Sequence, residues 1–162
     1  MLFRTPRLVT LTVVATVAFG GLSPLSAFAA GTEDGSSAAS TPAAAAGTYD
    51  QAKKLVYAGK YAEARVMLTG ITAAEPKNAD AWNLLGFSSR KTGDLKAASK
   101  AYGKALKLNP GHLGALEYQG EMYIQMGDAG KAKANLVKLQ GLCGTCEEAK
   151  DLQKAMAAAG IS

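Results

Sequence analysis

Two cysteines three positions apart are the residues of this chain best suited to chemistry. Cys143 and Cys146 stand in the stretch LCGTCEEAKDL at residues 142–152, and they are the only cysteines in the sequence. Pairs with this spacing occur in redox-active thiol sites, in metal sites, at haem attachment points and as structural disulfides. Which of these applies depends on the compartment that the chain occupies and on the elements that hold the pair.

Several of these chemistries are disfavoured by the neighbouring residues. Haem attachment requires a histidine after the second cysteine, where this chain has Glu147. A zinc site needs about four ligands, and the single histidine, His112, has no evident partners. We therefore expect neither a metal nor a cofactor. Thr145 and Glu148 have the spacing of a capping box, which places Cys146 in the first turn of a C-terminal helix.

The start of the chain has the pattern of an export signal. Arg4 and Arg7 precede an uncharged, mostly apolar stretch at residues 8–22, and Ala27 and Ala29 occupy small-x-small positions. The apolar core of about 15 residues is shorter than the roughly 20 that cross a bilayer as a helix. We expect a signal peptide at residues 1–29, cleaved after Ala29, no stable membrane span after cleavage, and a periplasmic or secreted protein. The alternative is that the segment is retained as an N-terminal anchor.

Export bears directly on the cysteine pair. Outside the cytoplasm a dithiol is usually oxidised. We therefore interpret Cys143 and Cys146 as a disulfide that fixes how the chain enters the helix after them. A thiol–disulfide or metal-handling role for the same pair is the alternative, and a high reduction potential or rapid exchange with glutathione would favour it.

Composition divides the rest of the chain in two. Residues 30–47 are small and polar and bury too little apolar surface to fold, so we expect a flexible Ala/Gly/Ser-rich leader there. Residues 48–162 are enough for one domain. Without Arg4 and Arg7, 16 basic residues face 13 acidic ones, a net charge near +3. A charge this weak and mixed argues against nucleic-acid binding.

Residues of matching type recur every 34 positions through the proposed domain. The matching sets are Gly59, Gly93 and Gly127; Ala64, Ala98 and Ala132; Ala52, Gly86 and Gly120; Leu68, Tyr102 and Leu136; and Pro76 and Pro110, with Gly144 in the third place. Small residues allow close helix packing. Glycines 59, 93 and 127 end one helix in a left-handed conformation, and Asp94 and Asp128 cap the next.

Residues 81–110 resemble a tetratricopeptide repeat. The signature positions are Trp82, Leu85, Gly86, Gly93, Ala98, Tyr102, Ala105 and Pro110, and the repeat departs at Ser89, where an aromatic is usual. The first repeat has Thr48 in place of the tryptophan and Lys60 in place of an acidic cap. The third has Leu116 in place of the tryptophan.

The resemblance implies an all-α fold, an α-solenoid of three helix pairs with a C-terminal capping helix. The repeats are expected at about 45–78, 79–112 and 113–146. Their helices are expected near 49–58 and 61–74, 79–91 and 95–107, and 113–126 and 129–141, with the capping helix at about 146–159.

No combination of residues suggests catalysis, so we do not expect an enzyme. The lone histidine has no serine or cysteine partner, and GDAGKA at residues 127–132 lacks residues that a phosphate-binding loop requires. The acidic pairs Glu117/Glu121 and Glu147/Glu148 are typical of solvated helix faces. The lysine row 96, 100, 104 and 107 is interpreted as a solvated outer face.

In proteins of the family that this chain resembles, the first helices of the repeats line a concave groove that receives a peptide. The groove positions implied here are Tyr49, Lys53, Tyr57, Asn83, Phe87, Arg90, Lys91, Glu117, Tyr118, Glu121, Ile124 and Gln125. Aromatic and arginine side chains are frequent anchors of binding. Leu84 and Gly114 break the family's clamp for a C-terminal carboxylate, which disfavours a chaperone-tail ligand.

The resemblance therefore predicts a non-catalytic module that binds a peptide or partner protein, as a monomeric scaffold or adaptor in the cell envelope. We expect Phe87→Ala or Arg90→Glu to weaken partner capture without changing the melting temperature. Two alternatives stay open. In the first alternative, the aromatic side chains of Tyr57, Phe87 and Tyr118 only pack between neighbouring helices and bind no partner. In the second, the protein self-associates through its repeat ends, which sedimentation would detect.

Overall fold

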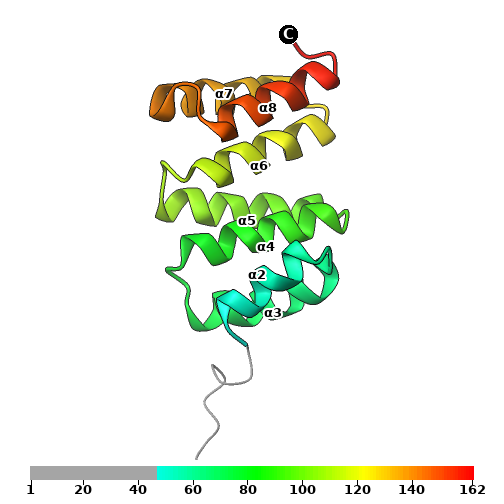
Figure 1. The fold of residues 1–162 in the computed structure, drawn as a ribbon, viewed down its shortest axis with the longest axis vertical. Helices are drawn as coiled ribbons and strands as arrows, with labels where there is room; N and C mark the ends of the chain where they lie inside the picture. Colours follow the sequence, from blue (N-terminus) through cyan, green and yellow to red (C-terminus); the bar gives the residue numbers. More distant parts are fainter. Residues whose placement is uncertain (1–46) are drawn as a thin grey trace, which may run out of the picture. The chain divides into compact units, whose positions relative to one another are not determined.

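The helices of this protein begin and end where the repeat pattern marks their boundaries. A computed structural model describes residues 47–162; the expected signal peptide, and all but the last residue of the expected leader, lie outside this range. Within the range every regular element is an α-helix (Figure 1). The bounds are α2 Tyr49–Tyr57, α3 Tyr61–Ala74, α4 Ala79–Lys91, α5 Leu95–Leu108, α6 Leu113–Gln125, α7 Ala129–Cys143 and α8 Glu147–Ala158. The expected all-α fold is confirmed, and each expected repeat helix agrees to within two residues.

Tight turns join the two helices of each pair. Gly59, Gly93 and Gly127 have φ values of 73°, 83° and 75°, in the left-handed region that a side chain disfavours. After two of these turns an aspartate caps the next helix: Asp94 accepts a hydrogen bond from the backbone N–H of Ala97, and Asp128 from that of Lys131. At the corresponding place Lys60 makes no side-chain cap. The pattern of capped and uncapped helices agrees with the sequence prediction.

The helices stack so that those of one type form a continuous row. Each pair, α2 with α3, α4 with α5 and α6 with α7, packs within itself, and α3 and α5 each contact the following pair through α4 and α6. The first helices α2, α4 and α6 also contact one another in series (Figure 1). This row places side chains of all three repeats on one face.

The last helix continues this row. α8 begins at Glu147, 34 residues after α6 begins at Leu113, which in turn begins 34 residues after α4 begins at Ala79. It packs against α6 and α7, as a fourth first helix would. The expected capping box at Thr145 is wrong: Cys146 is the N-cap residue and lies before the first turn, and no side chain caps the helix there.

The small residues of the repeat allow large neighbours to approach the helix backbone. A Cβ atom on Gly86 would lie 2.6 Å from two ring carbons of Tyr102, and one on Gly120 would lie 2.6 Å from a methyl carbon of Leu152. Tyr102 and Leu152 are fully buried. In the first repeat Ala52 and Leu68 take the positions of Gly86 and Tyr102, and both are fully buried. Leu68 is smaller than Tyr102, so it leaves room for the methyl group of Ala52.

Candidate functional site

A pocket of about 410 Å³ lies on the face formed by the first helices. Residues from α2, α3, α4, α6 and α8 line it: Tyr49, Lys53, Val56, Tyr57, Tyr61, Asn83, Leu84, Phe87, Gly114, Glu117, Tyr118 and Glu148. Tyrosines and a phenylalanine provide much of its lining, and one lysine and two glutamates bring charge to it. Its composition is that of an interaction surface with apolar contacts and directional polar groups.

The structure brings together most, but not all, of the residues expected in the groove. Those lining the pocket are Tyr49, Lys53, Tyr57, Asn83, Phe87, Glu117 and Tyr118. Those outside its lining are Arg90, Lys91, Glu121, Ile124 and Gln125. The sequence reasoning missed Val56, Tyr61 and Glu148, and it had considered Leu84 and Gly114 only as departures from the family's carboxylate clamp. Glu148 was detectable, because it follows the pocket residue Gly114 by 34 positions and α8 is in phase with the first helices.

Arg90 does not lie open to a partner, as the groove prediction required. Its side chain is 4% exposed, and its Nη2 atom lies 2.5 Å from Oε2 of Glu121. The guanidinium also lies 5.4 Å from the centre of the Phe87 ring and 6.0 Å from that of Tyr118. Because removing one partner of a buried ion pair is destabilising, we now expect Arg90→Glu to lower the melting temperature rather than leave it unchanged.

Lys91 and Gln125 lie at the C-terminal ends of α4 and α6 and are exposed. The Lys91 ammonium lies 5.3 Å from the centre of the Phe87 ring, at a cation–π distance. The four lysines of the row at 96, 100, 104 and 107 are also exposed, along α5. These cations belong to the surface outside the pocket.

The aromatic side chains of the pocket contact one another in a row. The ring centres of Tyr61 and Phe87 are 5.8 Å apart, and those of Phe87 and Tyr118 are 4.8 Å apart. These three side chains are partly buried, so each packs against a helix while still lining the pocket. Tyr57 is different, since it is 77% exposed. Its ring lies 5.9 Å from Lys53 Nζ, and the residue has little packing to lose if a ligand contacts it.

Glu117 is the electrostatic anomaly of the pocket. The residue is only 7% exposed, and burial is the largest of the causes that raise the pKa of its carboxyl from 4.5 to about 8. The negative charges of Glu121, Asp151 and Glu148 contribute to this increase, and the positive charge of Arg90 opposes it. The carboxyl therefore binds its proton more tightly in the folded protein than in the unfolded chain.

This pKa shift predicts a pH dependence of stability. Since the folded-state pKa is raised, the contribution of Glu117 is most favourable below its unfolded pKa of 4.5 and is lost as the pH rises to about 8. Glu117→Gln cannot titrate and should lack this loss. Urea unfolding from about pH 5 to pH 9 should show the variant gaining stability relative to the wild-type chain as the pH rises. Exposed Glu147→Gln is the control, and a pH-independent difference for Glu117→Gln would contradict the prediction.

Polar groups of the pocket include hydrogen-bond donors and a free acceptor. Burial raises the pKa of both Tyr49 and Tyr118 to about 12, and nearby acidic groups add to the effect, so their hydroxyls keep their protons at neutral pH. Asn83 is only 7% exposed, and its Oδ1 atom accepts no hydrogen bond from the described residues. A buried amide oxygen without a partner is unusual in a folded protein.

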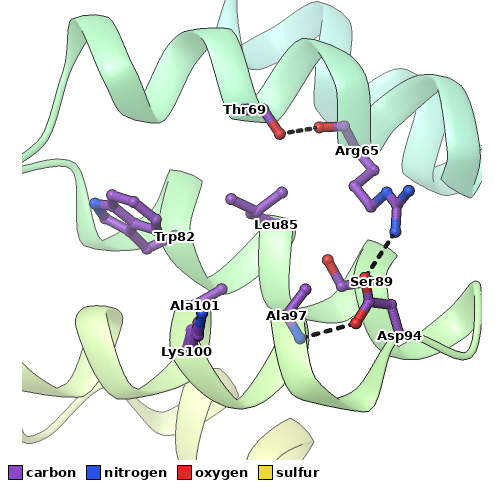
Figure 2. Close-up of a pocket in the computed structure, with 9 residues that line it drawn as sticks. All are labelled: Arg65, Thr69, Trp82, Leu85, Ser89, Asp94, Ala97, Lys100 and Ala101. Carbon is purple, nitrogen blue, oxygen red and sulfur yellow. Dashed lines mark hydrogen bonds and ion pairs between the residues drawn. The ribbon is translucent and has the colours of Figure 1, made fainter.

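A second pocket, of about 350 Å³, lies where α3, α4 and α5 meet (Figure 2). It is lined by Arg65, Thr69, Trp82, Leu85, Ser89, Asp94, Ala97, Lys100 and Ala101. Ser89 is fully buried, and its hydroxyl has no hydrogen-bond partner among residues 47–162. Leu55 and Tyr123 take the same place in the first and third repeats. The small side chain in the middle repeat thus coincides with an unfilled space.

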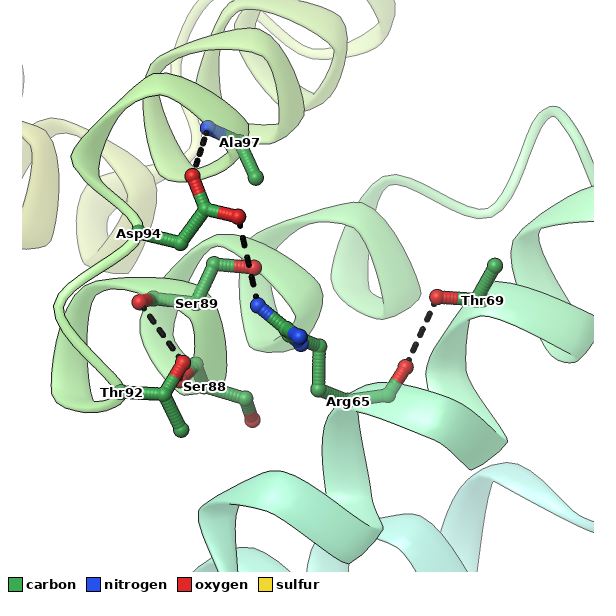
Figure 3. A network of polar contacts seen from close by, with 7 residues as sticks. All are labelled: Arg65, Thr69, Ser88, Ser89, Thr92, Asp94 and Ala97. Atoms are coloured by element: carbon green, nitrogen blue, oxygen red, sulfur yellow. Dashed lines mark hydrogen bonds and ion pairs between the residues drawn. The ribbon is translucent and has the colours of Figure 1, made fainter. Parts of the chain in front are cut away.

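A polar network borders this pocket (Figure 3). Arg65 Nη1 lies 3.3 Å from Asp94 Oδ2, while Asp94 Oδ1 accepts the N–H of Ala97 at 2.9 Å. Thr69 donates its hydroxyl to the Arg65 carbonyl. Both members of the ion pair are more than a third exposed, so the pair contributes little stability. The network links α3 to the start of α5 and leaves the Ser89 hydroxyl out.

Filling this space should stabilise the protein. Ser89→Leu, which copies the first repeat, adds apolar contacts and removes a buried hydroxyl without a partner. We expect the free energy of unfolding to rise by about 1 kcal/mol, measured by urea denaturation. The control is Ser88→Leu, a fully buried neighbour outside the pocket lining, which should destabilise by overpacking. A loss of stability in Ser89→Leu would show that the space cannot accept a side chain.

The single histidine serves the fold. Nδ1 of His112 accepts the backbone N–H of Ala115 at 3.3 Å and so caps α6. Its Nε2 atom lies 3.0 Å from Asp80 Oδ1, without hydrogen-bond geometry. Within residues 47–162, no three His, Cys, Asp or Glu side chains are grouped to hold a metal ion. None of the helices in that range combines the length and apolar character needed to span a membrane.

Comparison with known proteins gives the family of the middle repeat. Residues 79–112, which contain α4 and α5, match the family model described as Tetratricopeptide repeat. No curated protein sequence matches this chain significantly. The family assignment of the repeat therefore comes from the helix pair that also carries the strongest sequence signature.

Solved structures resemble the whole helical part of the chain. One is the first TPR of Spaghetti (RPAP3) bound to the HSP90 peptide SRMEEVD, with a TM-score of 0.63, 21% identity, and coverage of 74% of this chain and 94% of that one. Another is the Yersinia enterocolitica type III secretion chaperone SycD in complex with a peptide of the translocator YopD. Its TM-score is 0.60, its sequence identity is 19%, and the match covers 68% of this chain and 85% of that one.

A third is PcrH in complex with the chaperone binding region of PopD, with a TM-score of 0.60, 18% identity, and coverage of 69% of this chain and 85% of that one. At these identities the likeness concerns the fold. Together with the repeat match, it accounts for the stacked helix pairs and the continuous row of first helices. The chain thus contains a tetratricopeptide repeat at residues 79–112 and has the fold of tetratricopeptide-repeat proteins.

Proposed function

We propose that this protein is a non-catalytic interaction module that binds a peptide or an extended segment of a partner protein in the groove of its first helices. The observation that carries the proposal is the 410 Å³ pocket, to which α2, α4, α6 and α8 all contribute. Its aromatic row offers apolar contact area, while Asn83 and the tyrosine hydroxyls offer hydrogen bonds. A rigid stack of helices presents these groups with little ordering cost.

The similar structures support this proposal through their own ligands. The RPAP3, SycD and PcrH structures each contain a bound peptide or binding region of another protein. The groove proposed here differs in its chemistry from a clamp for a C-terminal carboxylate, because it is lined by Leu84 and Gly114 and contains two glutamates. A different class of peptide is therefore expected.

Selection from a library of short random peptides displayed on phage tests the groove assignment. Peptides enriched on the wild-type chain should bind Tyr57→Ala about tenfold more weakly, since Tyr57 is exposed in the pocket and contributes contact area. Val66→Ala is the matched control: Val66 is 75% exposed on α3 and lies outside the pocket lining. If no peptide is enriched, or if Tyr57→Ala binds as well as Val66→Ala, the groove is not the binding surface.

The proposal includes an exported, monomeric protein. Residues 1–29 would direct export, residues 30–47 would serve as a flexible leader, and residues 48–162 would act in the periplasm or outside the cell, as a scaffold or adaptor. Mass analysis of the mature N-terminus and sedimentation of the purified chain test these points. An N-terminus that retains residues 1–29 would support the anchored alternative, and concentration-dependent sedimentation would support self-association.

The cysteine pair is proposed to be a structural disulfide. The sulfur atoms lie at bonding distance and join Cys143, the last residue of α7, to Cys146, the N-cap residue of α8. A bond there would restrain how α8 joins the row of first helices. Free-thiol titration of protein from its native compartment separates this role from a thiol-exchange function. Two unreactive cysteines support the structural role, and a pair that exchanges rapidly with glutathione would oppose it.

A further inference from the structure

One buried carboxyl group in the groove has no positive partner. Glu117 is 7% exposed, yet none of the ion pairs among residues 47–162 includes it. Arg90, whose positive charge acts on Glu117, is itself paired with Glu121. Because an ionised carboxylate buried without a counter-charge is costly, Glu117 keeps its proton at neutral pH and ionises readily only when a positive charge is brought to it. A ligand that supplies such a charge would find an unpaired acid here.

The surroundings of Glu117 match the chemistry of a cation. Glu148 from α8 lines the same pocket and likewise forms no ion pair with the described residues. Tyr57 and Tyr118 line the pocket too, and the faces of aromatic rings attract ammonium and guanidinium groups. Independently of the carboxylates, the buried side-chain oxygen of Asn83 lacks a donor. Two acceptor types and aromatic walls thus converge on one pocket.

We propose that this pocket binds a basic side chain, lysine or arginine, of the bound peptide. Glu117 and Glu148 provide the counter-charges, Asn83 provides a hydrogen-bond acceptor, and the tyrosines contact the aliphatic stem and the cationic end. The inference rests on the proposed function, because it assigns the specificity of the same groove. Lys53, which lines the pocket from α2, opposes a second cation electrostatically and so should limit the affinity.

The charges around Glu117 also predict how binding depends on pH. The groups that face it are Glu121 on α6, Glu148 and Asp151 on α8, and Arg90 on α4, and the pocket is further lined by Lys53 and three tyrosines besides Tyr118. A bound cation favours the ionised carboxylate and thus releases the proton that Glu117 holds at neutral pH. Binding should strengthen as the pH rises, by about tenfold between pH 6 and pH 9.

The test uses the peptides that the phage library selection enriches. Enriched sequences should carry a lysine or arginine, and replacement of that residue by norleucine should weaken binding about tenfold at about pH 8, where half of Glu117 is ionised. Glu117→Gln should produce a similar loss and abolish the pH dependence, as measured by calorimetric titration. Glu148→Gln should weaken binding less, since its side chain is more exposed. Lys53→Gln, a change of opposite sign in the same pocket, should strengthen binding.

The outcomes separate the two proposals. If enriched peptides depend on Tyr57 but show no basic preference, or bind Glu117→Gln unchanged, the inference is overturned while the groove function stands. If no peptide depends on Tyr57, the groove function fails, and the inference fails with it. Circular dichroism of Glu117→Gln, which should match that of the wild-type chain, checks that the variant is folded. Glu148→Gln supplies a second readout. Because Glu148 is partly exposed, its replacement should leave the fold intact, so a loss of peptide affinity reports on binding.

Discussion

Replacing Arg90 by alanine is expected to lower the free energy of unfolding by about 3 kcal/mol. The change removes the cation from a buried pair and leaves the Glu121 carboxylate without its partner. It also removes the contacts of the guanidinium with the rings of Phe87 and Tyr118. Urea denaturation at neutral pH measures the loss. Because the Glu121 side chain is 26% exposed, water partly solvates the carboxylate that is left unpaired. The expected loss of stability is therefore at the lower end of the range for breaking a buried ion pair.

The neighbouring residue provides the matched control for this change. Lys91 is also cationic and also lies over the Phe87 ring, but it is exposed and has no ion pair among the described residues. Lys91→Ala should change stability by less than about 0.5 kcal/mol. A second variant, Arg90→Lys, keeps the charge and should recover part of the lost stability. If Arg90→Ala costs no more than Lys91→Ala, the pair does not hold α4 to α6.

Replacing Gly86 by alanine should cost about 2 kcal/mol despite the better helix propensity of alanine. The added methyl group would lie 2.6 Å from ring carbons of Tyr102, and that ring is fully buried. The helices α4 and α5 must then separate or the ring must leave its rotamer. Thermal and urea unfolding of the purified variant measure the effect.

A control and a rescue distinguish steric overlap from a general effect of alanine. Gly103 lies in α5 with nothing within 4 Å of an added Cβ, so Gly103→Ala should stabilise the protein by up to about 1 kcal/mol. Tyr102→Leu combined with Gly86→Ala reproduces the pair Ala52 and Leu68 of the first repeat. The double variant should lose less stability than the sum of the single changes. Additive losses would show that the two residues do not share the space.

These two predictions bear on the groove as well as on stability. Arg90 and Glu121 neutralise each other, so the charges left available to a ligand come from Lys53 and Glu148, and from Glu117 once it ionises. The close contact at Gly86 draws α4 against α5 and so fixes where α4 presents Asn83 and Phe87 to the pocket. A variant that loosens either contact should weaken peptide binding indirectly, so its stability must be measured together with its affinity.

The order and bounds of the helices could be predicted from the amino-acid sequence because they depend on local chemistry repeated every 34 residues. Gly59, Gly93 and Gly127 adopt the positive φ that only a residue without a side chain favours, and Asp94 and Asp128 cap the helices that follow. Each of these features requires only its neighbours along the chain. The start of α8 shows the limit of such reasoning, since the capping-box spacing at Thr145 was present but the box did not form.

The content of the groove depended on contacts between helices, which spacing along one helix does not specify. The family resemblance placed Arg90 and Glu117 on the groove face. Only the packing of α4 against α6 decided that Arg90 pairs with Glu121 and that Glu117 is buried without a cation. Likewise, α8 adds Glu148 to the pocket because it packs on α6 as a further first helix. Burial and charge pairing are set by whichever neighbour covers a side chain, and that neighbour is chosen by the stack as a whole.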